Sequence, residues 1–173
     1  MRAQLKVGNP LEEQTTVGPL VSEDGLLKVK EHVQDAVGKG AKLVTGGKLL
    51  ESSESRLFFE PTLITNVNKS MRVCHEETFG PLAAIVKFDC EEEVLELANS
   101  TRVGLASYFY SRDLAQIRRV ARGLQVGMIG VNEGILSCAE SPFGGVKESG
   151  LGREGSHLGI DEFCNIKSIV LNL

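Results

Sequence analysis

Between residues 82 and 133, three apolar runs alternate with two polar segments, and this alternation constrains the fold more than any other feature. The apolar runs are LAAIVKF, LASYFYS and VGMIGVNE, and the segments between them are CEEEVLELANST and SRDLAQIRRVARGL. Parallel strands that are joined by crossover helices produce this order, so the sequence predicts a right-handed parallel α/β unit. Because LAAIVKF is almost continuously apolar, we expect it to be a strand that is buried on both faces.

The two segments between the runs are predicted to be helices with distinct ends. CEEEVLELANST carries its acids in the first turn, where the helix dipole favours negative charge. In SRDLAQIRRVARGL we expect Ser111 to be the N-cap and the helix to end near Gly123.

A further helix is predicted over residues 22–40, with Ser22 as the N-cap. Its apolar positions recur at steps of three and four residues, at Leu26, Val29, Val33 and Val37. AKLVTGG then predicts a short strand, and FFEPTLITNV a strand that Pro61 interrupts. We expect a short helix around HLGIDEFCN and a half-buried terminal strand at KSIVLNL. His32 and His157 fall on predicted helices and are most simply interpreted as surface residues.

Composition excludes several classes of protein. Of the 173 residues, 42% are apolar and 24% are charged, and the net charge is −4, which disfavours nucleic-acid binding. No apolar stretch approaches the roughly 20 residues that cross a bilayer, so we expect no membrane partner. The N-terminus has no apolar signal-peptide core and no targeting segment, which predicts a soluble protein of the mitochondrion or cytoplasm. The four cysteines lack metal-ligand spacing and are interpreted as free thiols.

The segment HEETFGP, residues 75–81, permits two interpretations. It can be a strand-entry turn with solvated acids, or it can face a ligand. In the second case, Glu77 can accept two hydrogen bonds from a vicinal diol such as that of a ribose. Phe79 stands two residues further on, so it can point to the same side and pack on a flat ring.

The loop after the third apolar run has the same two interpretations. Ligands of α/β folds lie outside the carboxyl ends of strands, which places Asn132, Ser137 and Phe143 where a substrate could lie. The alternative is a surface loop that returns to the sheet. The glycine-rich stretch 141–155 does not match a phosphate loop, since it lacks G-x-x-x-x-G-K-[ST] and a G-x-G-x-x-G after a strand. Tight turns and close backbone approach explain its glycines better.

Taken together, EETFGP, VGMIGVNEG and PFGGVKESGLGREG resemble the C-terminal part of the aldehyde dehydrogenase superfamily, and the order and spacing are more specific than any one motif. The likeness covers essentially the whole chain and is closest to the succinate-semialdehyde branch. It implies an α/β fold in which residues 1–155 form the C-terminal portion of a catalytic domain with a parallel sheet. Residues 156–173 would form a tail with an oligomerisation strand, and the nucleotide-binding domain would be absent.

The resemblance also implies roles for particular residues. Glu77 matches a glutamate that binds the nicotinamide ribose of NAD or NADP, and Phe79 matches a phenylalanine beside the nicotinamide. Ser137 matches a serine that helps to hold a substrate carboxylate, and Phe143 an aromatic wall of the substrate tunnel. The implied partners are a small aldehyde and either identical or full-length subunits, bound through the C-terminal strand.

The catalytic groups of the family are not matched in this chain. No cysteine stands in the G-[QE]-x-C context of the nucleophile, and the E-L-G-G context of the general-base glutamate is absent. We therefore expect a piece of a dehydrogenase that does not oxidise aldehydes by itself. The alternative is a non-catalytic module that associates with full-length subunits.

Overall fold

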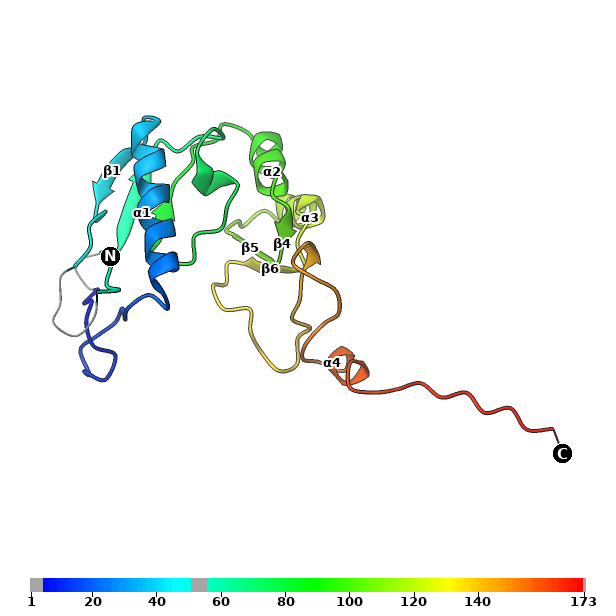
Figure 1. The fold of residues 1–173 in the computed structure, drawn as a ribbon. Helices are drawn as coiled ribbons and strands as arrows, with labels where there is room; N and C mark the ends of the chain where they lie inside the picture. The colour runs from blue at the N-terminus through cyan, green and yellow to red at the C-terminus, as the bar shows by residue number, and fades with distance from the viewer. Residues whose placement is uncertain (1–4, 51–55, 173) are drawn as a thin grey trace. The chain divides into compact units, whose positions relative to one another are not determined.

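The computed structural model describes residues 5–50 and 56–172, and these form two compact units (Figure 1). The first unit ends at Asp89 and the second begins at Cys90. The division falls just before the first of the two helices predicted between the apolar runs. The strands on either side of it therefore belong to different units.

In the first unit, one helix packs on a small mixed sheet (Figure 1). The sheet has the order β1–β2–β3, with β1 antiparallel to β2 and β2 parallel to β3. The elements are α1 (Glu23–Gly38), β1 (Lys42–Thr45), β2 (Thr62–Thr65), the 3-10 helix η2 (Arg72–Cys74) and β3 (Leu82–Ala84). Pro61 immediately precedes β2, so a residue without an N–H stands just outside the ladder.

Helix α1 confirms the predicted cap and most of the predicted apolar face. The Ser22 hydroxyl oxygen accepts a hydrogen bond from the Gly25 N–H at 3.1 Å. The buried face of the helix consists of Leu26, Val29, His32, Val33 and Ala36. The expectation that His32 is a surface residue was wrong, because its side chain is completely buried. It lies three residues after Val29 and four before Ala36, which puts it in the middle of the packed face.

The hydrophobic core of the first unit joins the helix to the sheet. One cluster is formed by Ala36, Ala41, Ile64, Val67 and Met71, and a second by Val29, Val33 and Phe59. Ile64 of β2 and Met71, which precedes η2, are fully buried. This packing fixes the start of the segment that leads from η2 to β3.

The second unit contains a parallel strand pair joined by a helix. Its elements are α2 (Glu91–Asn99), β4 (Val103–Gly104), β5 (Ala106–Phe109), α3 (Leu114–Gly123), β6 (Met128–Val131), β7 (Val146–Lys147) and the single turn α4 (Leu158–Asp161). β5 and β6 run parallel in register from Ala106↔Met128 to Phe109↔Val131, with α3 as the connection. β4 pairs with β7 in an antiparallel manner. The α/β class predicted from the sequence is confirmed.

Two details of the predicted α/β unit were wrong. The run LAAIVKF gives only the three-residue strand β3, in which Ala83 and Ala84 are exposed. Within the described residues, β3 pairs only with β2 and forms an edge of its sheet. The N-cap of α3 is Asp113 and not Ser111. The Asp113 carboxylate accepts hydrogen bonds from the Ala115 and Gln116 N–H groups.

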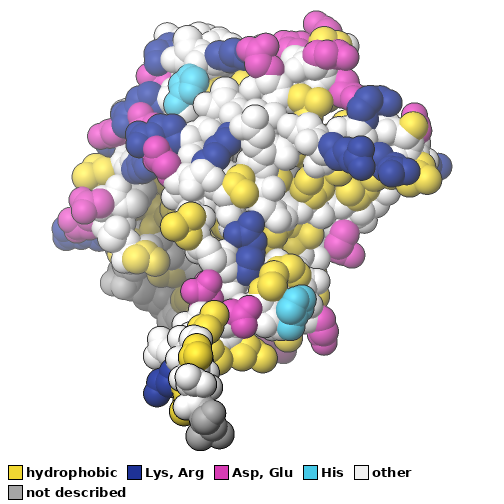
Figure 2. All heavy atoms as spheres, turned by 90° about the vertical axis from the view of Figure 1, so that its right-hand side faces the viewer, with side chains coloured by type: hydrophobic (Ala, Val, Ile, Leu, Met, Phe, Trp, Pro, Cys, Tyr) yellow, Lys and Arg dark blue, Asp and Glu magenta, His cyan; other side chains and the backbone are white. Residues whose placement is uncertain are grey.

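The C-terminal strand was not confirmed. Residues 164–172 form neither helix nor strand, and hydrophobic side chains lie exposed along them (Figure 2). Among these, Ile166 and Val170 are almost fully exposed. A strand needs a ladder partner, and the described part of this chain supplies none here. In the same described residues, no helix combines the length and apolar character that a bilayer crossing requires.

Candidate functional site

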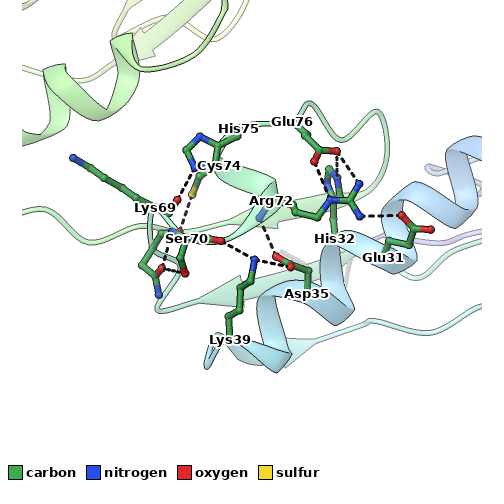
Figure 3. A network of polar contacts seen from close by, with 11 residues as sticks. Glu31, His32, Asp35, Lys39, Lys69, Ser70, Arg72, Cys74, His75 and Glu76 are labelled. Atoms are coloured by element: carbon green, nitrogen blue, oxygen red, sulfur yellow. Dashed lines mark hydrogen bonds and ion pairs between the residues drawn. The ribbon is translucent and has the colours of Figure 1, made fainter.

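The segment between η2 and β3 carries the first candidate residues and is held to helix α1 by a polar network (Figure 3). Arg72 donates two hydrogen bonds to the Glu76 carboxylate, each at 2.9 Å, and a third to Glu31 at 3.0 Å. The backbone N–H of Arg72 donates to the Asp35 carboxylate at 2.9 Å. Since Glu31 and Asp35 lie one turn apart on α1, Arg72 fastens the segment to one side of the helix.

The same network extends toward the start of the segment. Lys39, the C-cap of α1, forms an ion pair with Asp35 at 2.7 Å and donates to the Ser70 carbonyl at 2.7 Å. Hydrogen bonds from Lys39 and from the Arg72 backbone hold the pKa of the Asp35 carboxyl below its usual range. This end of the network therefore fixes η2 and not the residues that follow it.

Glu76 is the acid that connects η2 to the buried face of α1. The hydrogen bonds from Arg72 lower its pKa to about 2, and a weaker contact with His32 acts in the same direction. The same pair raises the pKa of the Arg72 guanidinium. Glu76 is thus an ionised structural acid at neutral pH, with its oxygens occupied by Arg72 and His32.

Glu77 and Phe79 are both exposed on the segment between η2 and β3. Residues 75–80 alternate between exposed and half-buried side chains, with Glu76, Thr78 and Gly80 on the inner side. Glu77 is exposed, and Phe79 is 83% exposed. No described residue hydrogen-bonds or pairs with the Glu77 carboxylate. The structure therefore leaves both the acid of Glu77 and the aromatic ring of Phe79 exposed, and their role in ligand binding stays a prediction.

Ser137 and Phe143 lie together in the second unit. They line one open pocket of about 440 Å³, which Cys138, Ala139, Glu154 and Gly155 complete. Phe143 is fixed by its backbone, because its N–H donates to the Glu154 carbonyl at 2.8 Å and its carbonyl accepts from the Glu154 N–H at 2.7 Å. Ser137 itself is exposed.

The glycine-rich stretch provides the close backbone approach that was predicted. A Cβ on Gly127 would lie 1.9 Å from the Gly144 carbonyl oxygen, so the chain after Phe143 can pass β6 only if glycine stands at position 127. Gly155 adopts a φ of 66°, in the left-handed region, at the edge of the pocket. These glycines shape the walls around Phe143 and do not form a phosphate-binding turn.

Asn132 has a structural role that sequence reasoning missed. Its side-chain oxygen accepts from the Ser111 N–H at 3.0 Å, and its side-chain nitrogen donates to the Ser111 carbonyl at 2.7 Å. The amide is therefore occupied in joining the ends of β5 and β6. Glu133 next to it accepts from the N–H groups of Gly134 and Ile135, which shapes the loop that leads to Ser137.

The surroundings of Cys74 alter its thiol. Burial raises the pKa of the Cys74 thiol, whose Sγ donates to the Asn68 carbonyl, so this thiol is less reactive than a free one. All four cysteines are unpaired. The part of the chain that the structure describes contains no cluster of three or more potential metal ligands.

Comparison with known proteins agrees with the resemblance that the motifs carry. The model of the aldehyde dehydrogenase family matches residues 1–169. The chain belongs to the aldehyde dehydrogenase family. The mitochondrial succinate-semialdehyde dehydrogenase of Homo sapiens is 58% identical over 169 residues, which are 98% of this chain and 31% of that protein. The glutarate-semialdehyde dehydrogenase of Pseudomonas putida is 51% identical over 99% of this chain and 35% of its own length.

Solved structures give the same family at the level of the fold. A succinate-semialdehyde dehydrogenase from Burkholderia pseudomallei has a TM-score of 0.89 at 52% identity, covering 94% of this chain and 33% of that one. A betaine aldehyde dehydrogenase from Staphylococcus aureus, solved in complex with NAD+, has a TM-score of 0.85 at 36% identity. The match covers 94% of this chain and 33% of that one. The chain thus spans about a third of the length of the relatives that it matches.

Proposed function

We propose that these residues work as the C-terminal part of an NAD(P)-dependent aldehyde dehydrogenase that oxidises succinic semialdehyde to succinate. Family membership and the names of the relatives support the reaction class. Succinic and glutaric semialdehydes both carry a carboxylate at the end opposite the aldehyde. The observation that carries the choice of substrate is the pocket that Ser137 and Phe143 share. It combines a hydroxyl donor with an aromatic wall, which suits a short chain with a charged end.

In this proposal, Glu77 and Phe79 hold the nicotinamide cofactor. The geometry fits such a group, because an exposed carboxylate without a protein partner can accept from both hydroxyls of a ribose. The neighbouring ring of Phe79 can cover a flat heterocycle and lose its exposure to water. When it is bound, the cofactor supplies the hydride acceptor, while these two side chains bind and orient it.

The chemical step requires residues other than those in this sequence. By resemblance to the family, a cysteine thiolate attacks the aldehyde and a glutamate activates water to release the acid. None of the four cysteines here has the sequence context of that nucleophile. We therefore propose that the chain alone is inactive and that it contributes cofactor and substrate contacts to a larger enzyme.

A second candidate function rests on the exposed C-terminal segment. Ile166, Ile169 and Val170 are each more than 70% exposed, and their backbone has no ladder partner among the described residues. Such a segment can pair with a strand of another subunit. A non-catalytic module that binds full-length subunits would use this segment without Glu77 or Ser137, so Glu77→Gln and Ser137→Phe would leave its association unchanged.

The substrate specificity of a Ser137 variant tests the proposed substrate. Ser137→Phe, placed in a complete dehydrogenase subunit that ends in this sequence, removes the donor and fills the space beside the carboxylate. We expect kcat/KM to fall for succinic semialdehyde by about tenfold or more relative to an uncharged aldehyde of similar length, because a lost hydrogen bond to a charge costs roughly 1.5–3 kcal/mol.

Ser137→Thr is the matched control, since it keeps a hydroxyl at the same position. It should preserve the ratio of the two kcat/KM values. If Ser137→Phe left that ratio unchanged, Ser137 would not contact the carboxylate, and the choice of succinic semialdehyde would lose its structural support.

A further inference from the structure

The buried imidazole of His32 contacts the two residues that flank Glu77. Its Nδ1 lies 2.6 Å from the Thr78 hydroxyl oxygen. Its Nε2 lies 3.4 Å from a Glu76 carboxylate oxygen (Figure 3). Because a carboxylate only accepts hydrogen bonds, Nε2 carries the proton and donates to Glu76. In the neutral ring, Nδ1 then accepts from the Thr78 hydroxyl.

Two residues on one face of α1 contact alternate residues of the segment between η2 and β3. Val29 and His32, three residues apart, face the segment from α1. On the other side, Glu76 and Thr78 contact His32, and Gly80 lies so close to Val29 that a Cβ at position 80 would come within 2.3 Å of a Val29 methyl group. Alternate residues 76, 78 and 80 are thus fixed against the helix, which leaves 77 and 79 to point away.

We propose that His32 is a positioning residue for the cofactor, because its contacts with Glu76 and Thr78 hold the Glu77 carboxylate in the direction that a ribose requires. This inference rests on the proposed function. His32 does not touch the cofactor itself. The observation that carries it is a fully buried histidine whose two nitrogens contact the residues immediately before and after Glu77.

Thr78→Val in the complete enzyme subunit is the first test, because it removes one hydroxyl at nearly constant volume. We expect the dissociation constant of the reduced cofactor, measured by its fluorescence, to rise by about tenfold through weakening of the Glu77 contact. KM for the cofactor should rise, while KM for the aldehyde stays within twofold or so. His32→Gln retains a hydrogen-bond donor and an acceptor, so this variant should bind the reduced cofactor nearly as well as the wild type. His32→Leu retains neither, so it should bind the cofactor more weakly.

Lys39→Met is the matched control. It breaks the ion pair with Asp35 and the bond to the Ser70 carbonyl in the same network, but it leaves Glu76 and Thr78 untouched. A general loss of stability in the first unit would affect this variant too. We expect its melting temperature to fall without a change in cofactor affinity.

A double-mutant cycle separates this inference from the proposed function. If His32 acts through Glu77, Thr78→Val changes the dissociation constant little in a Glu77→Gln background. If Glu77→Gln alone had no effect, the proposed cofactor contact would be wrong. If Glu77→Gln weakened binding but Thr78→Val did not, or if the two effects were simply additive, the positioning role of His32 would be overturned.

Discussion

At the scale of single residues, the candidate site depends on side chains that the protein leaves exposed. Phe79 is 83% exposed, although an aromatic ring gains considerably from burial. Glu77 beside it lacks a partner in the described residues, whereas its neighbour Glu76 has two. Two adjacent acids therefore have opposite roles, and only the second is free to bind a ligand.

The Glu77→Gln substitution tests that distinction. In a complete subunit, the amide keeps the size of the side chain but loses its charge, so we expect cofactor affinity to fall by about tenfold or more, from the roughly 1.5–3 kcal/mol of a charge-assisted hydrogen bond. Titration with the reduced cofactor measures the dissociation constant. Glu92→Gln, at an exposed position of α2, is the control and should bind as the wild type does.

The sequence suggested Glu77 and Phe79 as candidates because a spacing of two residues puts side chains on one side of an extended segment, and their role in cofactor binding stays a prediction. It missed His32, since a polar residue on a helix was interpreted as exposed. The helical spacing could have revealed its burial, because His32 lies three residues after Val29 and four before Ala36, both on the buried face. The partners Glu76 and Thr78 lie more than 40 residues away in the chain, and local patterns do not give such contacts.

At the scale of elements, the ion pairs of Glu76 predict how the first unit responds to acid. Its pKa is about 2 in the folded protein against an ordinary value of 4.5. Because folding lowers this pKa, the contacts of Glu76 stabilise the fold above about pH 4.5, and this contribution is lost as the pH falls toward 2. Asp35, whose pKa is also lowered, adds a loss in the same direction in the first unit, and Glu91 does so in the second unit.

Urea unfolding of the chain and of its Glu76→Gln variant, followed by circular dichroism, isolates the contribution of Glu76. We expect the wild type to be the more stable at about pH 6 and the two midpoints to converge as the pH approaches 2. A difference that stays constant over this range would show that the pKa of Glu76 is not lowered in the folded chain.

Helix α3 gives a second prediction at this scale, through its N-cap. Asp113→Ala leaves the Ala115 and Gln116 N–H groups without their side-chain acceptor, which should destabilise the second unit by about 1 kcal/mol. Asp113→Asn retains a side-chain acceptor, so this variant should lose much less stability. Chemical denaturation of the three proteins provides the comparison, and equal stability of the alanine and asparagine variants would contradict the capping role.

The helices were more predictable than the strands. A cap residue and a period of three to four residues identified α1, and the acids of the first turn identified α2. β3 was wrongly expected to be buried, since an apolar run does not reveal whether other elements cover both faces of its strand. Ser111 was mistaken for the cap of α3 because both Ser111 and Asp113 are suitable residue types, and only geometry decides between them.

At the scale of the whole molecule, burial differs between the two units. Among the described residues, every buried hydrophobic side chain lies before residue 72. Large apolar residues of the second unit remain exposed, among them Tyr110, Leu114, Ile135 and Phe163. Apolar surface of this extent is typical of faces that pack against other parts of a protein or another subunit. It supports the proposal that the chain acts within a larger dehydrogenase.

The most direct test of that central claim is the rate of cofactor reduction by a chimera in which this sequence replaces the matching part of the human relative. The purified chain alone serves as the comparison. With succinic semialdehyde and NAD or NADP, we expect turnover by the chimera and none by the chain alone, because only the chimera contains a nucleophilic cysteine in the family context. A folded chimera that fails to reduce either cofactor, or turnover by the chain alone that survives repurification, would contradict it.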